Sequence, residues 1–228
     1  PDHPGSASPL IPVGVLGGSF DPVHRGHVAL ACHALRTLGL ERVLLLPCAD
    51  PPHKPDRALA PRYHRLEMLY LAVEDRHRLD VSTFEIAQGG VRYTIDTLRA
   101  LRSGTPSLAP VFLCGSDALA DVASWREHEA LLAEFDFAAV IRPNDAGVPR
   151  NPGWPDVVAR NVAPLPPASG DALGAGGRVF CVEMPALAVS SSLVRTRCAS
   201  GRPTDDLVPA RVARYIQRHH LYSEEVAR

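Results

Sequence analysis

The stretch that most constrains the fold lies near the N-terminus, where a short apolar run meets two glycines. Residues 11–16 are mostly apolar and stop at Gly17-Gly18, which is typical of a buried strand followed by a turn. Residues 27–38 then carry apolar side chains at helical spacing, and Gly39 stands where that helix should end. Because open α/β sheets bind ligands at the carboxyl ends of their parallel strands, this turn is predicted to face a ligand.

Strands and helices are predicted to alternate along the rest of the chain. The strands are expected at residues 42–47, 79–86, 111–114, 137–141 and 179–182, with a short one around Val162. The helices are expected at residues 61–75, 94–103, 117–133 (with a break near 124–125), 192–200 and 209–219. This alternation predicts an α/β fold, a Rossmann-like doubly wound parallel sheet with helices on both faces and a small C-terminal helical part.

A single domain is expected, because a chain of 228 residues can bury a large apolar core without disulfides or metals. Residues 1–10 are predicted to be a disordered leader, and residues 11–228 to form that domain. Residues 144–177 are dense in Pro, Gly, Ala and Asp, which predicts a long excursion rather than a second core. Residues 190–222 are expected to hold the C-terminal helices.

Charge and cysteine content narrow the partners and the compartment. The formal net charge of −1 provides no general basic surface for nucleic acid, although a basic cluster at residues 57–65 could bind small anions. The five cysteines lie far apart and form no CxxC pair, which indicates reduced, packed thiols. No signal peptide and no membrane-length apolar run is seen, so a cytoplasmic protein without membrane contact is expected. The sequence leaves the oligomeric state open.

The residue types at positions 17–27 suit a phosphate site. Gly17 and Gly18 carry no Cβ, so backbone N–H groups can approach an anion closely. The helix that begins near His24 directs its N–H groups and its dipole at the same anion, and His24 and His27 share one face. One alternative is a tight turn with two surface histidines. A His-x-x-His metal site is another, but no Cys or carboxylate at helical spacing completes a ligand set.

A second anion site is predicted near the C-terminus. Ser190, Ser191 and Ser192 precede a helix with apolar periodicity, whose N-terminus can offer hydroxyl and N–H groups to an anion. Arg195 follows one turn later, where its guanidinium could hold a phosphate in a bidentate manner. Plain helix capping by the serines is the alternative.

Both segments resemble motifs of the nucleotidylyltransferase superfamily. Residues 17–27 resemble its GGTFDPxHxGH signature, with Ser19 in place of the usual Thr, and residues 189–195 resemble its ISSTxIR motif. The resemblance implies catalytic roles for His24, His27 and Arg195. The residues that it implies for ATP binding are Gly17, Gly18, Ser19, Phe20, His24, His27, Gly115, Asp117, Ser190, Ser191, Ser192 and Arg195.

Four further segments resemble the nicotinate-nucleotide adenylyltransferase family in particular. They are PPHKP at residues 51–55, RLEML at 65–69, YTIDTL at 93–98, and GSD followed by WRE between 115 and 127. The resemblance implies that His53 and Lys54 approach the acceptor phosphate, and that N–H groups of a helix begun by Thr94 receive a carboxylate. It implies that Trp125 stacks on the nicotinate ring. Taken singly, Thr94 could be a plain N-cap and Trp125 an ordinary core aromatic.

The resemblance implies an adenylyltransferase that joins ATP and nicotinate mononucleotide, giving nicotinate adenine dinucleotide and pyrophosphate in NAD biosynthesis. The acceptor phosphate would attack the α-phosphorus of ATP, so catalysis needs positioning and charge stabilisation rather than a covalent nucleophile. Mg²⁺ is expected to be bound with ATP, mainly through phosphate oxygens and water. Two alternatives stay open: transfer to nicotinamide mononucleotide or another phosphate acceptor, and a non-catalytic nucleotide-binding sensor.

Overall fold

A computed structural model describes residues 10–50, 59–141, 154–165, 173–185 and 187–223, so most of the predicted leader lies outside the described residues. The described residues contain a seven-stranded sheet in the order β3-β2-β1-β4-β5-β7-β6, in which all neighbouring strands are parallel. The strands are β1 (Ile11–Gly18), β2 (Arg42–Pro47), β3 (Leu79–Val81), β4 (Leu108–Gly115), β5 (Asp136–Ile141), β6 (Val162–Ala163) and β7 (Val179–Glu183).

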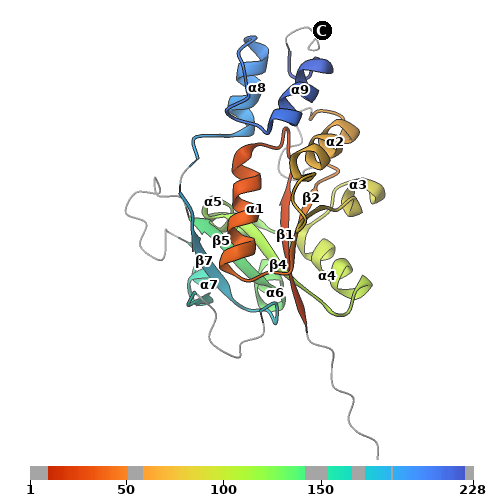
Figure 1. Cartoon of the computed structure of the whole chain (residues 1–228). Helices are drawn as coiled ribbons and strands as arrows, with labels where there is room; N and C mark the ends of the chain where they lie inside the picture. The colour runs from red at the N-terminus through yellow and green to blue at the C-terminus, as the bar shows by residue number, and fades with distance from the viewer. Residues whose placement is uncertain (1–9, 51–58, 142–153, 166–172, 186, 224–228) are drawn as a thin grey trace, which may run out of the picture.

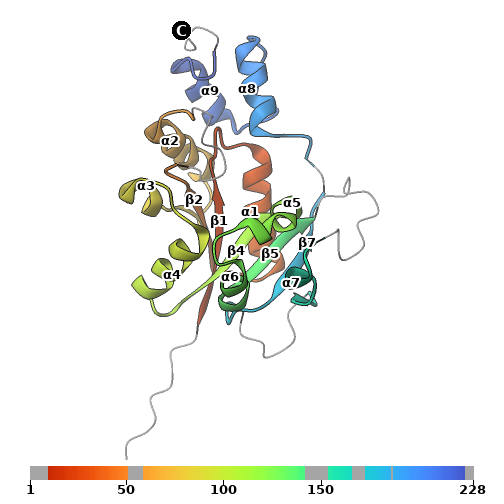
Figure 2. The ribbon, with the colours of Figure 1, turned by 180° about the vertical axis from the view of Figure 1, so that it is seen from behind.

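Helices cover both faces of this sheet. They are α1 (Arg25–Thr37), α2 (Arg62–Val73), α3 (Phe84–Gln88), α4 (Thr94–Gly104), α5 (Ser116–Ala120), the 3₁₀ helix η1 (Val122–Ser124), α6 (His128–Glu134), α7 (Asp156–Ala159), α8 (Ser191–Ala199) and α9 (Ala210–Arg218). Helix α1 crosses the face seen in Figure 1, whereas α5 and α6 lie on the face seen in Figure 2. Helices α8 and α9 lie beyond the carboxyl end of β1 (Figure 1). The predicted doubly wound parallel sheet with a C-terminal helical part is confirmed.

Two apolar cores fill the space between the sheet and its two helical layers. Leu16 of β1 packs in the core that contains residues of α1, α2, α8 and α9. Its neighbour Val15 packs in the core that contains residues of α4, α5, α6 and α7. Successive side chains of a strand point to opposite faces, so β1 contributes to both cores. Burial on both faces explains the nearly continuous apolar runs of the central strands.

The order of the strands creates a crevice at one end of the sheet. From β1 the chain adds β2 and then β3 on one side, and it returns to add β4 and β5 on the other. The connections on the two sides therefore leave β1 and β4 toward opposite faces of the sheet. The carboxyl ends of these two strands are where an open α/β sheet has room for a ligand.

The strand predicted at residues 79–86 is wrong in its second half. Strand β3 covers only its first three residues, and α3 begins at Phe84. The backbone N–H of Phe84 donates to Ser82 Oγ at 3.3 Å, a local bond that turns the chain away from the sheet. Glu85 is then buried on α3, where it accepts a hydrogen bond from Thr97 Oγ1 at 2.8 Å. A short apolar run does not by itself distinguish a strand from a short buried helix.

The described parts of the Pro- and Gly-rich excursion pack against the body of the sheet. They contain α7, and β6 lies at the predicted position around Val162. Trp154 is buried, and its Nε1–H donates to the Ser116 carbonyl at 3.0 Å. The Gly174 N–H and the Arg178 guanidinium both donate to the carboxylate of Asp136 at 2.7 Å. The prediction of one domain over residues 11–228 agrees with this packing and stays a prediction.

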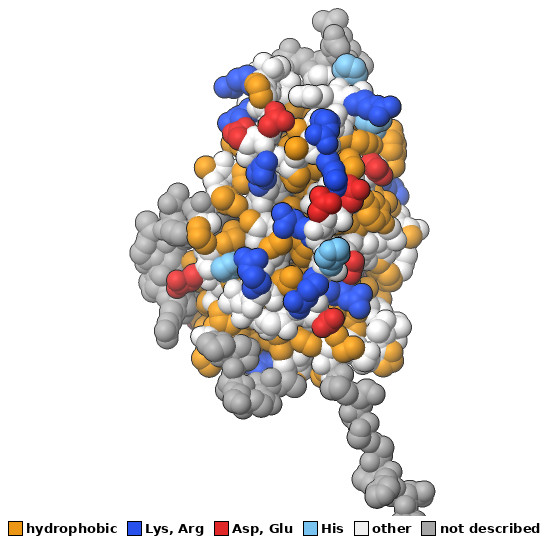
Figure 3. Space-filling model, viewed as in Figure 1, with side chains coloured by type: hydrophobic (Ala, Val, Ile, Leu, Met, Phe, Trp, Pro, Cys, Tyr) orange, Lys and Arg blue, Asp and Glu red, His pale blue; other side chains and the backbone are white. Residues whose placement is uncertain are grey.

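The surface seen in Figure 3 has mixed charge, and the cysteines, all of which the structure describes, form no disulfide. On the face seen in Figure 3, basic and acidic side chains are interspersed among hydrophobic ones. All five cysteines are free thiols. In the described part of the chain, no helix has both the length and the apolar character needed to span a membrane.

Candidate active site

A cavity of about 680 Å³ opens at the carboxyl ends of β1 and β4. Its walls come from the end of β1, the first turn of α1, the start of α4, the end of β4 and the start of α8. This is the crevice that the strand order creates, and a concave site of this size can enclose a small molecule. The predicted site residues that line it are Gly17, Gly18, Ser19, His24, His27, Thr94, Gly115, Asp117, Trp125, Ser190, Ser191 and Ser192.

The other predicted site residues are not among the described residues that line this cavity. His53 and Lys54 lie outside the described residues. Phe20 is only 1% exposed, and its ring packs edge-on against the His27 ring at a centroid distance of 4.9 Å. Arg195 lies beside the cavity, where its two terminal nitrogens donate to the Asp21 carbonyl at 2.5 Å and to Ser192 Oγ at 2.9 Å. In the structure, Phe20 packs against the cavity residue His27, and Arg195 connects α8 to the turn after β1.

His24 and His27 form a reciprocal cap at the N-terminus of α1. The His27 N–H donates to His24 Nδ1 at 3.4 Å, and the His24 N–H donates to His27 Nδ1 at 3.2 Å. The two rings stack with their centroids 3.7 Å apart. A Cβ on Gly26 would lie 3.0 Å from the His24 ring and 3.1 Å from Val189, so glycine preserves both contacts. The alternative of two surface histidines is therefore wrong.

The cap fixes where these rings carry their hydrogen. Because Nδ1 accepts a hydrogen bond in both rings, the hydrogen of the neutral form lies on Nε2. Burial, and to a smaller extent the neighbouring His24, hold the pKa of His27 well below its ordinary value. His27 is therefore neutral at pH 7 and is able to donate one Nε2–H to an anion.

The serines at the start of α8 both cap the helix and line the cavity. Ser190 is the N-cap, and its Oγ accepts a hydrogen bond from the Leu193 N–H at 3.1 Å. The Ser191 hydroxyl donates to the Pro22 carbonyl at 2.9 Å, which ties α8 to the turn after β1. The capping alternative is correct for Ser190. It does not exclude an anion site, because the first turn of α8 still forms part of the cavity wall.

The opposite wall combines the start of α4 with an aromatic ring. Thr94 is the first residue of α4 rather than its N-cap, which is Tyr93, and no side chain caps this helix. The α4 N-terminus thus retains N–H groups that a ligand oxygen could accept from. Trp125 lines the cavity while its ring packs perpendicular to Phe112 at 5.9 Å. Trp125 therefore packs against the apolar core and also lines the cavity, so the two interpretations of this residue are compatible.

Three charged residues on the cavity wall were not among the predicted site residues. They are Glu85, Arg92 and Arg126. Burial raises the pKa of the Glu85 carboxyl, and Thr97 and then Arg92 oppose that shift. The sequence does not single out Glu85, because it predicts a strand over a segment that forms α3. Arg126 directly follows the predicted site residue Trp125, and this adjacency is the sequence feature that could have indicated it.

Arg65 is excluded from the basic cluster predicted at residues 57–65 as a possible anion site, because its guanidinium is buried and occupied. Its side chain is 1% exposed and is occupied by backbone acceptors. The guanidinium donates to the carbonyls of Ser19 at 2.8 Å, Cys48 at 2.9 Å, Ala49 at 3.1 Å and Ala60 at 3.1 Å. Arg65 therefore connects the turn after β1 to the chain that leaves β2, and both segments contribute to the cavity wall.

The described residues include no group of three or more His, Cys, Asp or Glu side chains that could hold a metal ion. Asp117 lines the cavity in the first turn of α5.

Comparisons with known proteins agree with this geometry. The cytidylyltransferase-like family model matches residues 15–197. A probable nicotinate-nucleotide adenylyltransferase of Symbiobacterium thermophilum is 41% identical over 211 residues, covering 92% of this chain and 94% of its own. The corresponding protein of Streptomyces coelicolor is 36% identical over 214 residues, covering 92% of this chain and 100% of its own.

A solved structure shares the fold at low sequence identity. The nicotinic acid mononucleotide adenylyltransferase of Plasmodium falciparum, solved in complex with NaAD, superposes with a TM-score of 0.71 at 19% identity, covering 92% of this chain and 97% of that one. Together with the family model and the relatives above 30% identity, this likeness places the chain by fold and by sequence. The chain belongs to the cytidylyltransferase-like family and, within it, to the nicotinate-nucleotide adenylyltransferases.

Proposed function

We propose that this protein transfers the adenylyl group of ATP to the phosphate of nicotinate mononucleotide, forming nicotinate adenine dinucleotide and pyrophosphate. The observation that carries the proposal is the cavity itself, which places two helix N-termini and a histidine pair opposite an uncapped helix start and a tryptophan. One wall suits a polyphosphate and the other suits a flat, negatively charged ring. The names of the relatives support this assignment of substrates.

The ATP phosphates are assigned to the wall formed by β1, α1 and α8. Backbone N–H groups at Gly17, Gly18 and Ser19 and the Nε2–H groups of His24 and His27 would donate to the phosphate oxygens. Donors fixed in place before the reaction stabilise the charge that develops on the transferring group and on the leaving pyrophosphate. The first turn of α8, with Ser190, Ser191 and Ser192, would hold the β- and γ-phosphates, and Gly115 and Asp117 the adenosine.

Arg195 acts in this scheme as a further phosphate contact. In the structure its guanidinium is occupied by the Asp21 carbonyl and Ser192 Oγ. A phosphate at the start of α8 would compete for the nitrogen that reaches Ser192. The same proposal assigns the backbone at Phe20 to the ATP turn, because its side chain is buried.

The acceptor is assigned to the wall formed by α4 and Trp125. The N–H groups at the start of α4, near Thr94, would receive the carboxylate, and the Trp125 ring would stack on the pyridine ring. His53 and Lys54 would meet the acceptor phosphate and offset the repulsion between the two anionic substrates. In the reaction, an oxygen of the acceptor phosphate forms a bond to the α-phosphorus of ATP. The bond from that phosphorus to the bridging oxygen breaks, and pyrophosphate carries away the electron pair.

Mg²⁺ is proposed to arrive with ATP. Its chemistry would be to neutralise charge on the phosphate oxygens during transfer. The protein would orient the ion indirectly, through the donors that hold the phosphates. We also propose a cytoplasmic location, which the five free thiols support.

The test is an assay of pyrophosphate release from ATP and Mg²⁺ with nicotinate mononucleotide or nicotinamide mononucleotide as acceptor. A kcat/KM at least tenfold higher with the nicotinate form supports the proposal. Comparable values would instead establish a dual-specificity enzyme. Folded protein that binds ATP but releases no pyrophosphate with either acceptor would favour the non-catalytic sensor.

A further inference from the structure

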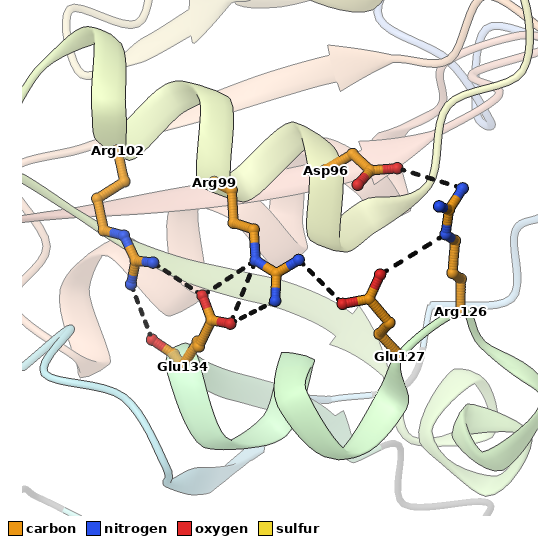
Figure 4. Close-up of polar contacts among 6 residues, drawn as sticks. All are labelled: Asp96, Arg99, Arg102, Arg126, Glu127 and Glu134. Carbon is orange, nitrogen blue, oxygen red and sulfur yellow. Dashed lines mark hydrogen bonds and ion pairs between the residues drawn. The ribbon is translucent and has the colours of Figure 1, made fainter.

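Arg126 is a cavity residue whose guanidinium is held only loosely. It lines the cavity together with Tyr93, Thr94 and Trp125. Its guanidinium carbon lies 4.9 Å from the centre of the Tyr93 ring. Its ion pairs, to Asp96 at 3.8 Å and to Glu127 at 3.7 Å, are both longer than a hydrogen bond. Figure 4 shows Arg126 between Glu127 and Asp96, in a chain of charged side chains that continues through Arg99 and Glu134 to Arg102.

The two other arginines in this row of charged side chains, Arg99 and Arg102, make short hydrogen bonds to carboxylates. Arg99 donates to Glu127 at 3.0 Å and to Glu134 at 2.5 Å, and Arg102 donates to Glu134 at 2.8 Å. Neither Arg99 nor Arg102 lines the cavity. The close pairs therefore join α4 to α6, whereas Arg126, which lines the cavity, makes only the two longer ion pairs in this group (Figure 4).

Two carboxylates that do not themselves line the cavity lie next to Arg126, Asp96 at 3.8 Å and Glu127 at 3.7 Å. Asp96 lies in the first turn of α4, two residues after Thr94, and Glu127 is the N-cap of α6. Each is partly exposed, with 38% and 43% of its side-chain surface accessible. Two carboxylates at this position would repel an anionic ring substituent, and Arg126 is the cation that contacts both.

We infer that the Arg126 side chain determines specificity for an acceptor whose ring carries a carboxylate rather than a carboxamide. The inference rests on the proposed function and adds to it a residue that discriminates between the two acceptors. A guanidinium offers a carboxylate charge-assisted hydrogen bonds, and it screens Asp96 and Glu127 from the incoming charge. A carboxamide has no net charge, so it gains neither effect.

Arg92 is the other guanidinium on the cavity wall, and its electrostatics differ. It acts on the buried carboxyl of Glu85, whose pKa it helps to lower against the effect of burial. Arg126 instead adjoins Trp125 and contacts the acidic residue beside Thr94. The structure therefore favours Arg126 over Arg92 for the ring substituent.

Steady-state kinetics of the Arg126→Gln variant with both acceptors test the inference. The expected result is a fall of about tenfold in kcat/KM for nicotinate mononucleotide, with little change for nicotinamide mononucleotide and in the KM for ATP. Arg126→Lys should lie between, because it keeps the charge without the planar fork. Asp96→Asn, which removes the competing carboxylate, should raise the preference for the nicotinate acceptor.

Arg102→Gln is the matched control. It removes the same charge from the same chain of ion pairs, away from the cavity wall, and should leave the ratio of the two acceptors unchanged. An unchanged acceptor ratio in Arg126→Gln overturns the inference. An equal loss with both acceptors also overturns it, because that loss would mean a structural role.

Binding measurements separate this inference from the proposed function. Calorimetric titration with nicotinate mononucleotide, without ATP, reports recognition of the ring substituent whether or not turnover occurs. Weaker binding of this ligand to Arg126→Gln, with unchanged binding of nicotinamide mononucleotide, supports the inference even if no pyrophosphate is released. Wild-type protein that binds both acceptors equally contradicts the inference and leaves adenylyl transfer standing.

Discussion

Replacement of Arg65 by Met should destabilise the fold by about 3–5 kcal/mol, because it leaves buried backbone carbonyls without their donor, at about 1–3 kcal/mol for each that stays unsatisfied. Four backbone carbonyls accept from this guanidinium at 2.8–3.1 Å in a site that is 1% exposed. Hydrogen bonds from a charged donor contribute roughly 1.5–3 kcal/mol each, so their simple sum is about 6–12 kcal/mol. The expected loss is smaller, because the variant no longer desolvates a cation and water can reach some carbonyls.

Urea unfolding followed by tryptophan fluorescence measures this loss as a change in the free energy of unfolding. Arg65→Lys should fall between wild type and Arg65→Met, because one ammonium cannot reach all four carbonyls. Arg62→Met on the same helix is the control. Its exposed side chain makes a 3.7 Å ion pair with Asp50, so its loss should stay below about 1 kcal/mol. A loss below about 1 kcal/mol in Arg65→Met, at an unchanged m-value, would refute the reasoning.

Three further predictions concern the turn after β1. His27→Ala should lower kcat by about 10²–10³-fold, the effect of losing one transition-state hydrogen-bond donor, and a folded variant with normal kcat in the pyrophosphate assay would falsify that role. Because the pKa of His27 is lowered in the fold, the unfolded chain binds more protons below about pH 6.5. The stability that neutral His27 contributes is therefore fully present above that pH and is lost as the pH falls toward the pKa of His27 in the folded state. Urea unfolding at several pH values should show that the free energy of unfolding falls less steeply with decreasing pH in His27→Gln than in the wild type. Tyr222→Phe removes the 2.8 Å hydrogen bond to Asp21 Oδ1 and should cost about 1–3 kcal/mol, read as a lower Tm, whereas Tyr70→Phe on the exposed face of α2 should leave Tm unchanged.

The elements with a clear periodicity could be predicted from the sequence. β1, α1, β2 and α4 lie within a few residues of their expected positions, because glycines mark several of their ends and their apolar spacing is regular. The region after β3 could not be predicted. There α3 begins beside a local hydrogen bond from Phe84 N–H to Ser82 Oγ, and buried Glu85 accepts from Thr97 of another helix, contacts that apolar periodicity does not record.

The sequence brings the residues proposed to bind phosphate together more readily than those proposed to bind the acceptor. The former belong to two contiguous strings, so a local pattern brings them together. The burial of the Phe20 side chain could not be predicted from the sequence. It depends on a positive φ of 46° at Phe20 and on the packing of its ring against His27. The relation of Arg126 to Asp96 is a tertiary contact between α4 and the segment before α6, and no local spacing records it.

The two segments proposed to bind anions, residues 17–27 and 189–195, are joined by hydrogen bonds. Asp21 and Pro22 have no predicted contact with substrate, yet their carbonyls accept from Arg195 and from the Ser191 hydroxyl of α8. Asp21 Oδ1 accepts from the Tyr222 hydroxyl at 2.8 Å, near the end of the described chain. The turn after β1 therefore lines the cavity directly and holds the start of α8, another part of the cavity wall, in place. A substitution at Asp21 should consequently disturb both parts of the wall together, although the two segments are far apart in the sequence.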